Sequence, residues 1–236
     1  MKNRKQAMSK NTKAYFNRIA GEWSSHYSEA GLMRSRIQRF VGAIEEFANL
    51  DTKILDFGCG SGELTRALSD KGWQVKACDI SEEMLRRAEN VTEENYIDWR
   101  LLREQRDLKL PFDDASFDVI MASSVFEYIS TPEVYLHEFN RILANNGRIL
   151  ISVPDMRHPL RVAEEARRRN LILKVFRRIW NLSLYGKDTD YLKYSITRYS
   201  PEDWLYLLKD CSFNPSSISV PSDPLLLLQA KKDCDC

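Results

Sequence analysis

The sequence predicts an α/β fold built on a mostly parallel sheet. The evidence is the order in which its short apolar runs occur. Between residues 53 and 155, runs of strand length alternate with segments of helical spacing, as in parallel strands joined by helices. The first run, Ile54-Leu55, leads through Asp56-Phe57 into glycines at alternate positions, Gly58, Gly60 and Gly62. Two last runs, 214–220 and 225–230, flank Pro221-Ser-Asp-Pro224 and predict an antiparallel terminal hairpin.

The composition is that of one globular domain in a reducing compartment. The chain has 236 residues, of which 43% are hydrophobic and 29% charged, and its net charge of +1 gives no general attraction to nucleic acid. Five cysteines form no disulfide framework, and Cys59 lies within the glycine loop. No secretory leader follows the basic N-terminus, and no apolar run reaches membrane-spanning length. We expect a cytoplasmic protein without a metal site.

We expect a single domain, 1–236, in four segments: a helical cap (1–50), a ligand-binding core (51–155), a lid insertion (156–200), and a terminal helix and hairpin (201–236). In the cap, helical spacing begins at Thr12, and Tyr15, Ile19 and Trp23 share one face. The cap could pack against the sheet edge or cover the ligand site.

The glycine loop predicts a site for a nucleotide-like group. Glycine at a strand end permits positive φ and close approach of a ligand, and the helix that follows directs free N–H groups at the same place. A dinucleotide pattern, G-x-G-x-x-G, fails here because Glu63 and Thr65 stand where the last glycine is required. The alternative is a purely structural turn between strand and helix.

Asp79 directly follows the next apolar run, 73–78, and lies about twenty positions beyond the glycines. At this position a carboxylate can accept hydrogen bonds from two ribose hydroxyls. The alternative for Asp79 is a helix N-terminal role before Ser81, which we expect to cap a helix from Glu82 to Asn90. Ile80 and Met84 could flank an adenine ring or belong to the core.

Together these motifs resemble the class I S-adenosylmethionine-dependent methyltransferases of the bacterial small-molecule type. The resemblance rests on Asp-x-Gly-x-Gly-x-Gly at 56–62, on Leu110-Pro-Phe112, and on Ser116-Phe-Asp-Val-Ile120, and covers about 50–155. It implies a Rossmann-like sheet of seven strands, with S-adenosylmethionine as methyl donor and S-adenosylhomocysteine as product. Residues 14–27 resemble the N-terminal helices that close over the cofactor in this family.

The resemblance also implies cofactor contacts residue by residue. In the family, an Asp five positions before the Pro of the Leu-Pro-Phe motif binds the adenine amino group. Here that proline is Pro111, Arg106 stands five positions before it, and the aspartate, Asp107, comes one position later. The expected cofactor-binding residues are Asp56, Gly58, Cys59, Gly60, Gly62, Asp79, Ile80, Met84, Asp107, Leu108 and Ser123.

Tyr128 ends Ser123-Ser-Val-Phe-Glu-Tyr128, a segment that lines the junction of cofactor and substrate in the resembled family. That family often has His where Tyr128 stands, and a phenol is a poor base at neutral pH but a good hydrogen-bond donor. For Glu127 we favour a structural role. The remaining candidates for a general base are His26, Tyr128 and His158, and the expected substrate contacts are Tyr27, Tyr128, Tyr194 and Arg198.

A basic stretch follows the fifth expected strand, 148–153, which a turn at Asn145-Asn-Gly147 precedes. From Arg157 to Arg178 there are seven Arg and one Lys against two Glu, and apolar and basic positions alternate with helical spacing. Three roles stay open: a lid helix, a membrane-surface helix spanning 157–182, or a grip on an anionic substrate or RNA backbone.

The expected reaction is O- or C-methylation of a small metabolite, for example one that is quinone-, lipid- or sugar-linked. A tRNA-directed enzyme and a cofactor-binding protein without catalysis are the alternatives. Nucleic acid is the less favoured partner because no Asn-Pro-Pro-Tyr-type motif for planar amino groups is present. Nothing in the sequence indicates the oligomeric state.

Overall fold

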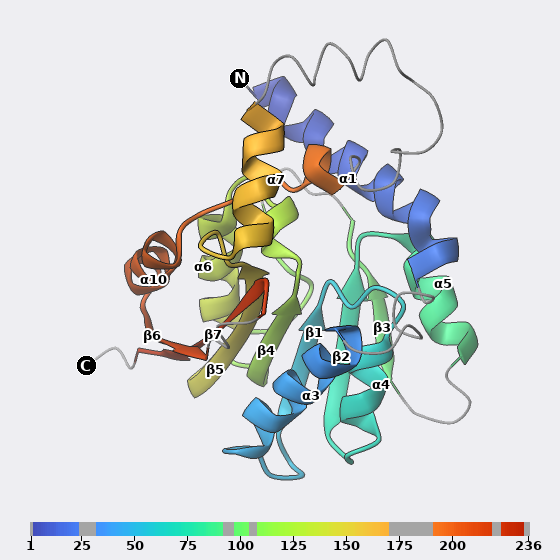
Figure 1. Ribbon diagram of the computed structural model, residues 1–236. Coiled ribbons are helices and arrows are strands. Elements are labelled where there is room, and N and C mark those ends of the chain that lie inside the picture. The colour runs from blue at the N-terminus through green and yellow to red at the C-terminus, as the bar shows by residue number, and fades with distance from the viewer. Residues whose placement is uncertain are drawn as a thin grey trace.

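A computed structural model describes residues 2–23, 32–91, 97–103, 108–169, 191–218 and 223–233, and shows a seven-stranded sheet with helices on both faces (Figure 1). The strands are β1 (Lys53–Phe57), β2 (Gln74–Asp79), β3 (Asp98–Leu101), β4 (Phe117–Ser123), β5 (Leu143–Pro154), β6 (Phe213–Ile218) and β7 (Leu225–Lys232). The helices are α1 (Lys2–Trp23), α3 (Leu32–Glu45), α4 (Glu63–Ser69), α5 (Glu82–Val91), the 3-10 turn η1 (Phe126–Tyr128), α6 (Pro132–Ile142), α7 (Pro159–Arg169) and α10 (Pro201–Asp210).

The strand order is β3-β2-β1-β4-β5-β7-β6, which confirms the fold class expected from the sequence. Strands β1 to β5 pair in parallel, and β7 runs antiparallel between β5 and β6. The order reverses at β1, whose neighbours are β2 and β4. In open α/β sheets ligands bind outside the carboxyl ends of the strands at such a switch point.

Alternation along the strands divides the core between the two faces of the sheet. Val119 and Met121 of β4 pack with α3 and α4, whereas Ile120 and Ala122 pack with α6 and α10. All four of these side chains are fully buried. A parallel strand that is buried on both faces needs an unbroken apolar run, and Val119-Ile-Met-Ala122 supplies it.

The cap differs from the expectation in where its first helix begins. Helix α1 starts at Lys2, ten residues before Thr12, and lies across the end of the sheet toward α5 (Figure 1). The side chain of Asn17 accepts a 2.6 Å hydrogen bond from the Ser81 hydroxyl at the start of α5. Ser81 also accepts from the backbone N–H of Met84, so the expected cap of α5 is present and is itself held by α1.

The fifth strand is longer than its apolar run suggests. It begins at Leu143, includes Asn145-Asn-Gly147 and slips register against β4 between Phe117 and Val119. Asn146 takes the turn conformation with φ +65°, so the expected turn is absorbed into a bulged strand.

The lid is only partly within the described residues. Helix α7 covers 159–169, and residues 170–182 of the expected basic stretch lie outside the described residues. Within the described part, no helix combines the length and apolar character that crossing a membrane requires. The division into four segments stays a prediction.

Gly62 is expected to be required for packing. It has φ +82°, and a Cβ there would lie 2.5 Å from Trp99 Cη2. Gly62→Ala should therefore lower the free energy of unfolding by about 2–4 kcal/mol in urea titrations, from backbone strain and overpacking together. Gly42→Ala is the control, because Gly42 lies within α3 and a Cβ there meets nothing within 4 Å; it should stabilise by about 0.5–1 kcal/mol. Equal effects of the two substitutions would contradict this account.

Candidate functional site

A cavity of about 800 Å³ opens at the carboxyl ends of β1, β2 and β4. Helices α1 and α3 contribute Thr12, Phe16, Trp23 and Arg36 to its wall, so the cap covers the ligand site. Of the expected cofactor-binding residues, the cavity is lined by Asp56, Gly58, Cys59, Gly60, Asp79, Ile80, Met84, Leu108 and Ser123. Asp107 lies outside the described residues, and Gly62 packs under Trp99 away from the cavity wall.

The glycine loop is held against β2 by its own backbone. The N–H groups of Gly58 and Cys59 both donate to the carbonyl of Cys78, at 2.7 and 3.1 Å. Gly58 and Gly60 have φ of +75° and +56°, and a Cβ at Gly58 would overlap the Val125 side chain. A Cβ at Gly60 would lie 3.4 Å from Trp23 Nε1, so α1 closes directly onto the loop.

Asp79 joins the loop to the next helix. Its two carboxylate oxygens accept from Gly60 N–H at 2.9 Å and from Ser81 N–H at 2.8 Å. Burial raises the pKa of Asp79, and these backbone hydrogen bonds oppose the rise. A carboxylate has about four acceptor sites, so Asp79, which lines the cavity, could still accept from two ligand hydroxyls. The helix-terminal role and the ribose role are therefore compatible in one side chain.

Asp56 is buried beneath the loop, and only one of its two carboxylate oxygens has a hydrogen-bond partner. The Thr65 hydroxyl donates to Oδ2 at 2.6 Å, whereas the buried Oδ1 has no partner. Burial raises the pKa of Asp56 to about 7. A cationic or N–H donor group entering the cavity would complete this side chain.

Two further cavity residues carry buried polar atoms without a partner, Ser124 Oγ and Arg36 Nε. Ser124 has φ +56°, an unusual conformation for a residue with a side chain, and is the first residue after β4. Buried polar groups in native proteins are almost always paired. Three such atoms around one cavity indicate a polar ligand, and their types fit one with hydroxyl, cationic and anionic groups.

Tyr128 lies at the other end of the site. It lines the cavity, and its ring meets the Phe16 ring edge-on at 4.9 Å between centroids. Low-dielectric surroundings raise the pKa of Tyr128 well above its ordinary value, and the charge of Glu127 adds to the rise. The phenol therefore stays protonated at neutral pH and can act as a donor but not as a base.

Of the other candidates for the base and for substrate contacts, those within the described residues are not in the cavity wall. His158 accepts from the Leu160 N–H at the start of α7, and His26 and Tyr27 lie outside the described residues. Tyr194 stacks on Tyr15 at 4.4 Å, and Arg198 pairs with Glu164 at 2.9 Å. Tyr194 and Arg198 are thus engaged with other side chains and do not line the cavity.

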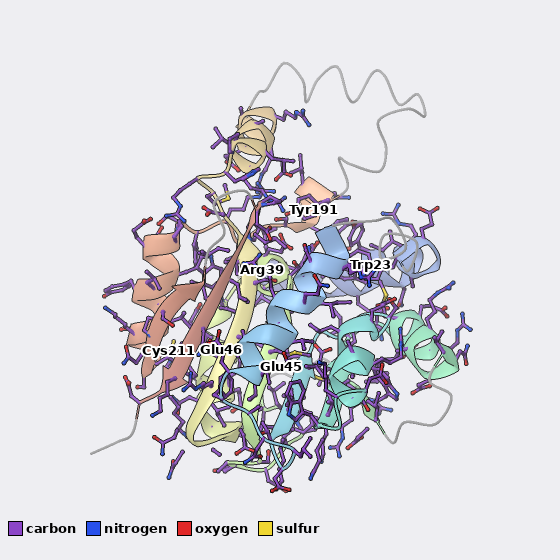
Figure 2. The ribbon with its side chains drawn as sticks, turned by 60° about the horizontal axis from the view of Figure 1, so that its bottom comes forward. Trp23, Arg39, Glu45, Glu46, Tyr191 and Cys211 are labelled. Atoms are coloured by element: carbon purple, nitrogen blue, oxygen red, sulfur yellow. The ribbon has the colours of Figure 1, made fainter. Side chains whose placement is uncertain are left out.

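Glu127 connects the lid to the sheet. Its carboxylate accepts from the Tyr191 hydroxyl at 2.6 Å, and its backbone carbonyl accepts from the N–H groups of Ile196 and Thr197. Figure 2 shows Tyr191 at the same end of the molecule as Trp23. These contacts agree with the structural role favoured for Glu127.

Sequence reasoning missed the residues that the cap brings to the site, above all Phe16 and Arg36. Phe16 was visible only as one member of an apolar helical pattern. Arg36 stands beside Ile37 in an amphipathic stretch, where an arginine ordinarily faces solvent. Nothing local distinguishes either residue, because their function depends on how α1 and α3 dock.

Comparison with known proteins identifies the family to which the ligand-binding segment belongs. A family model described as a methyltransferase domain matches residues 55–151. A demethylmenaquinone methyltransferase of Tropheryma whipplei is 30% identical over 167 residues, which cover 70% of this chain and 67% of that protein. A malonyl-[acyl-carrier protein] O-methyltransferase of Erwinia billingiae is 33% identical over 63% of this chain and 56% of its own length.

A solved structure extends the likeness in fold to nearly the whole chain. Magnesium protoporphyrin IX methyltransferase from Synechocystis, determined with bound SAH, superposes with a TM-score of 0.65. The match covers 95% of this chain and 100% of that one at 18% sequence identity. At that identity the likeness concerns the fold.

The half-satisfied Asp56 should make stability depend on pH. Its folded-state pKa of about 7 lies above the ordinary 3.8, so the protonated form stabilises the fold at low pH and this contribution is lost as pH rises through 7. Asp56→Asn keeps an acceptor for Thr65 and removes the buried charge. Relative to the natural protein, its free energy of unfolding should rise between pH 4 and 8, by up to about 4 kcal/mol. Parallel stability curves of the two proteins, measured without ligand, would contradict this.

Proposed function

The chain belongs to the class I S-adenosylmethionine-dependent methyltransferases, and from that premise we propose that it methylates an oxygen or carbon of a small-molecule acceptor. Bound S-adenosylmethionine supplies an electrophilic methyl group on a positively charged sulfur. The task left to the protein is to hold donor and acceptor in line and to exclude water.

The unsatisfied polar atoms around the cavity carry the proposal for the donor site. Asp79 would accept from the ribose hydroxyls, since it lines the cavity and its carboxylate has acceptor sites beyond those used by Gly60 and Ser81. The free Oδ1 of Asp56 would accept from the amino group of the methionine part. Ile80 and Met84 would flank the adenine, and the glycine loop would let the backbone approach closely.

The acceptor would lie against the aromatic wall at the Tyr128 end. Phe16 and Tyr128 offer ring surface there, which suits a small acceptor with an apolar body. The relatives named for demethylmenaquinone and for malonyl-[acyl-carrier protein] support a metabolic acceptor. The intact glycine loop and Asp79 disfavour a protein that only binds the cofactor, and the net charge of +1 disfavours tRNA.

The donor site is tested by calorimetric binding of S-adenosylhomocysteine. Asp79→Ala should lose at least tenfold in affinity, because two ribose hydroxyls lose an acceptor. Asp118→Ala is the matched control: Asp118 also accepts from a backbone N–H, that of Lys53, but outside the cavity wall. Equal affinity of the natural protein and Asp79→Ala would overturn the assignment.

The acceptor class is tested by methyl transfer from labelled S-adenosylmethionine into a cell extract separated into organic, polar, protein and RNA fractions. Label in a small-molecule fraction, absent with Asp79→Ala, is expected. Label in RNA would reject the small-molecule acceptor.

Peripheral contact with a membrane through 157–182 is a second proposal, which rests on the basic and apolar pattern of that stretch. The protein should co-sediment with vesicles that contain anionic lipid, and the double substitution of Phe176 and Trp180 by Ser should abolish this. Equal sedimentation of both proteins would refute it.

A further inference from the structure

The chain between β3 and β4 passes the cavity without regular secondary structure at residues 108–112, a segment that we call the strap. Four of its residues line the cavity: Leu108, Lys109, Leu110 and Pro111. A segment outside helices and strands has no ladder of backbone hydrogen bonds to hold it, so its N–H and C=O groups must find partners elsewhere. Charged side chains of two neighbouring elements are the partners here.

Arg141 and Glu138 of α6 bind the strap from one side. Arg141 donates through Nη2 to the carbonyl of Leu110 at 3.1 Å and through Nη1 to the carbonyl of Phe112 at 3.0 Å. Glu138 Oε2 accepts from the N–H of Leu110 at 2.8 Å. The two side chains also pair with each other at 2.8 Å, and the hydrogen bond from Arg141 holds the pKa of Glu138 below its ordinary value. Both groups therefore stay charged, and hydrogen bonds to charged groups are the stronger ones.

Arg100 binds the strap from the other side. It lies on β3, donates to the carbonyl of Pro111 at 3.1 Å, and places its guanidinium 5.3 Å from the centre of the Phe112 ring. The Asp98 carboxylate accepts from Arg100 at 2.7 Å and fixes its orientation. The three successive carbonyls of residues 110–112 thus accept from guanidinium groups that are anchored on α6 and β3.

The strap lies on the Asp79 side of the cavity. Strand β3 pairs with β2 so that Leu101 lies opposite Asp79, and the strap is attached to Arg100, the residue before Leu101. The N–H of Leu102 donates to the carbonyl of Asp79 at 2.8 Å. Apart from two exposed cations, the described cavity residues between 101 and 111 are all apolar: Leu101, Leu102, Leu108, Leu110 and Pro111. An apolar wall beside the carboxylate assigned to the ribose suits the flat ring of a base.

We propose that Arg141 is a positioning residue of the donor site: together with Glu138 and Arg100 it holds the strap as a wall against which the adenine of the donor packs. This inference rests on the proposed methyltransferase function. Arg141 itself does not line the cavity, so it acts through the strap and not on the ligand. A strap released from Arg141 would have to be ordered when the ligand binds, and that cost would lower the affinity of ligands that carry the base.

Three ligands test this role by calorimetry, with competition against S-adenosylhomocysteine for the weakest of them. S-adenosylhomocysteine carries the base and the amino acid, 5′-methylthioadenosine lacks the amino acid, and S-ribosylhomocysteine lacks the base. Arg141→Gln should bind the two adenine ligands about tenfold more weakly than the natural protein does, with unchanged affinity for S-ribosylhomocysteine. Arg141→Lys can reach one carbonyl at a time and should lose less. A residue that only stabilised the fold would change all three affinities by the same factor, or none of them.

Lys232→Gln is the matched control. Lys232 also donates to two main-chain carbonyls, those of Asn140 and Leu143 at 2.8 and 2.9 Å, and both carbonyls lie outside the strap. This variant should keep all three affinities of the natural protein. Arg100→Gln releases only the Pro111 carbonyl, from a side chain that is 37% exposed, and should show the same selective loss to a smaller degree. It provides the decisive comparison if thermal melting shows that Arg141→Gln is not folded.

Two results would overturn the positioning role: affinities for the adenine ligands that are equal in the natural protein and in the folded arginine variants, or equal losses for ligands with and without the base. A natural protein that binds no S-adenosylhomocysteine would refute the proposed function itself. The two failures are therefore distinguished by the natural protein alone.

Discussion

The contact on which the site depends is the one between the Asp79 carboxylate and the backbone of the glycine loop. Asp79 ends β2 and accepts from Gly60 N–H after β1 and from Ser81 N–H before α5. One side chain therefore fixes the distance between two strand ends and the start of a helix. A loop of glycines has a large conformational entropy to lose, and a buried charge-assisted hydrogen bond is strong enough to order it.

Helix α1 of the cap is held against that loop and the start of α5. Asn17 of α1 accepts from the hydroxyl of Ser81, two residues from Asp79, and Trp23 reaches Gly60. Of the alternatives left open for the cap, packing or covering the site, the structure shows both: α1 covers the cavity, and α3 packs on the sheet. Helix α3 then contributes both core, through Phe40 and Ile44, and a cationic wall, through Arg36.

The cavity is polar where a donor would be held and aromatic where an acceptor would lie. Its unpaired atoms belong to Asp56, Ser124 and Arg36, and all three are kept in place by main-chain elements of the sheet or by α3. Placing unsatisfied groups on rigid elements costs stability in the empty protein and lowers the reorganisation needed on binding. On this account, the elevated pKa of Asp56 is the cost of a preorganised site.

The sequence by itself determined the strands, the order in which they occur and the glycine-loop end of the cavity, because those features are local. A glycine loop, an acidic strand end and a capped helix each lie within a few residues, and the alternation of apolar runs makes a parallel sheet the only way to bury them. Only the tertiary structure decided which residues from distant segments complete the cavity wall. Phe16, Arg36 and Tyr128 lie far apart in the chain, and all three line the cavity because of how α1 and α3 pack across the sheet. It also decided that Gly62 packs against Trp99, that Tyr194 stacks on Tyr15 and that Arg198 pairs with Glu164, because stacking and ion pairing between distant segments leave no periodic pattern in the sequence.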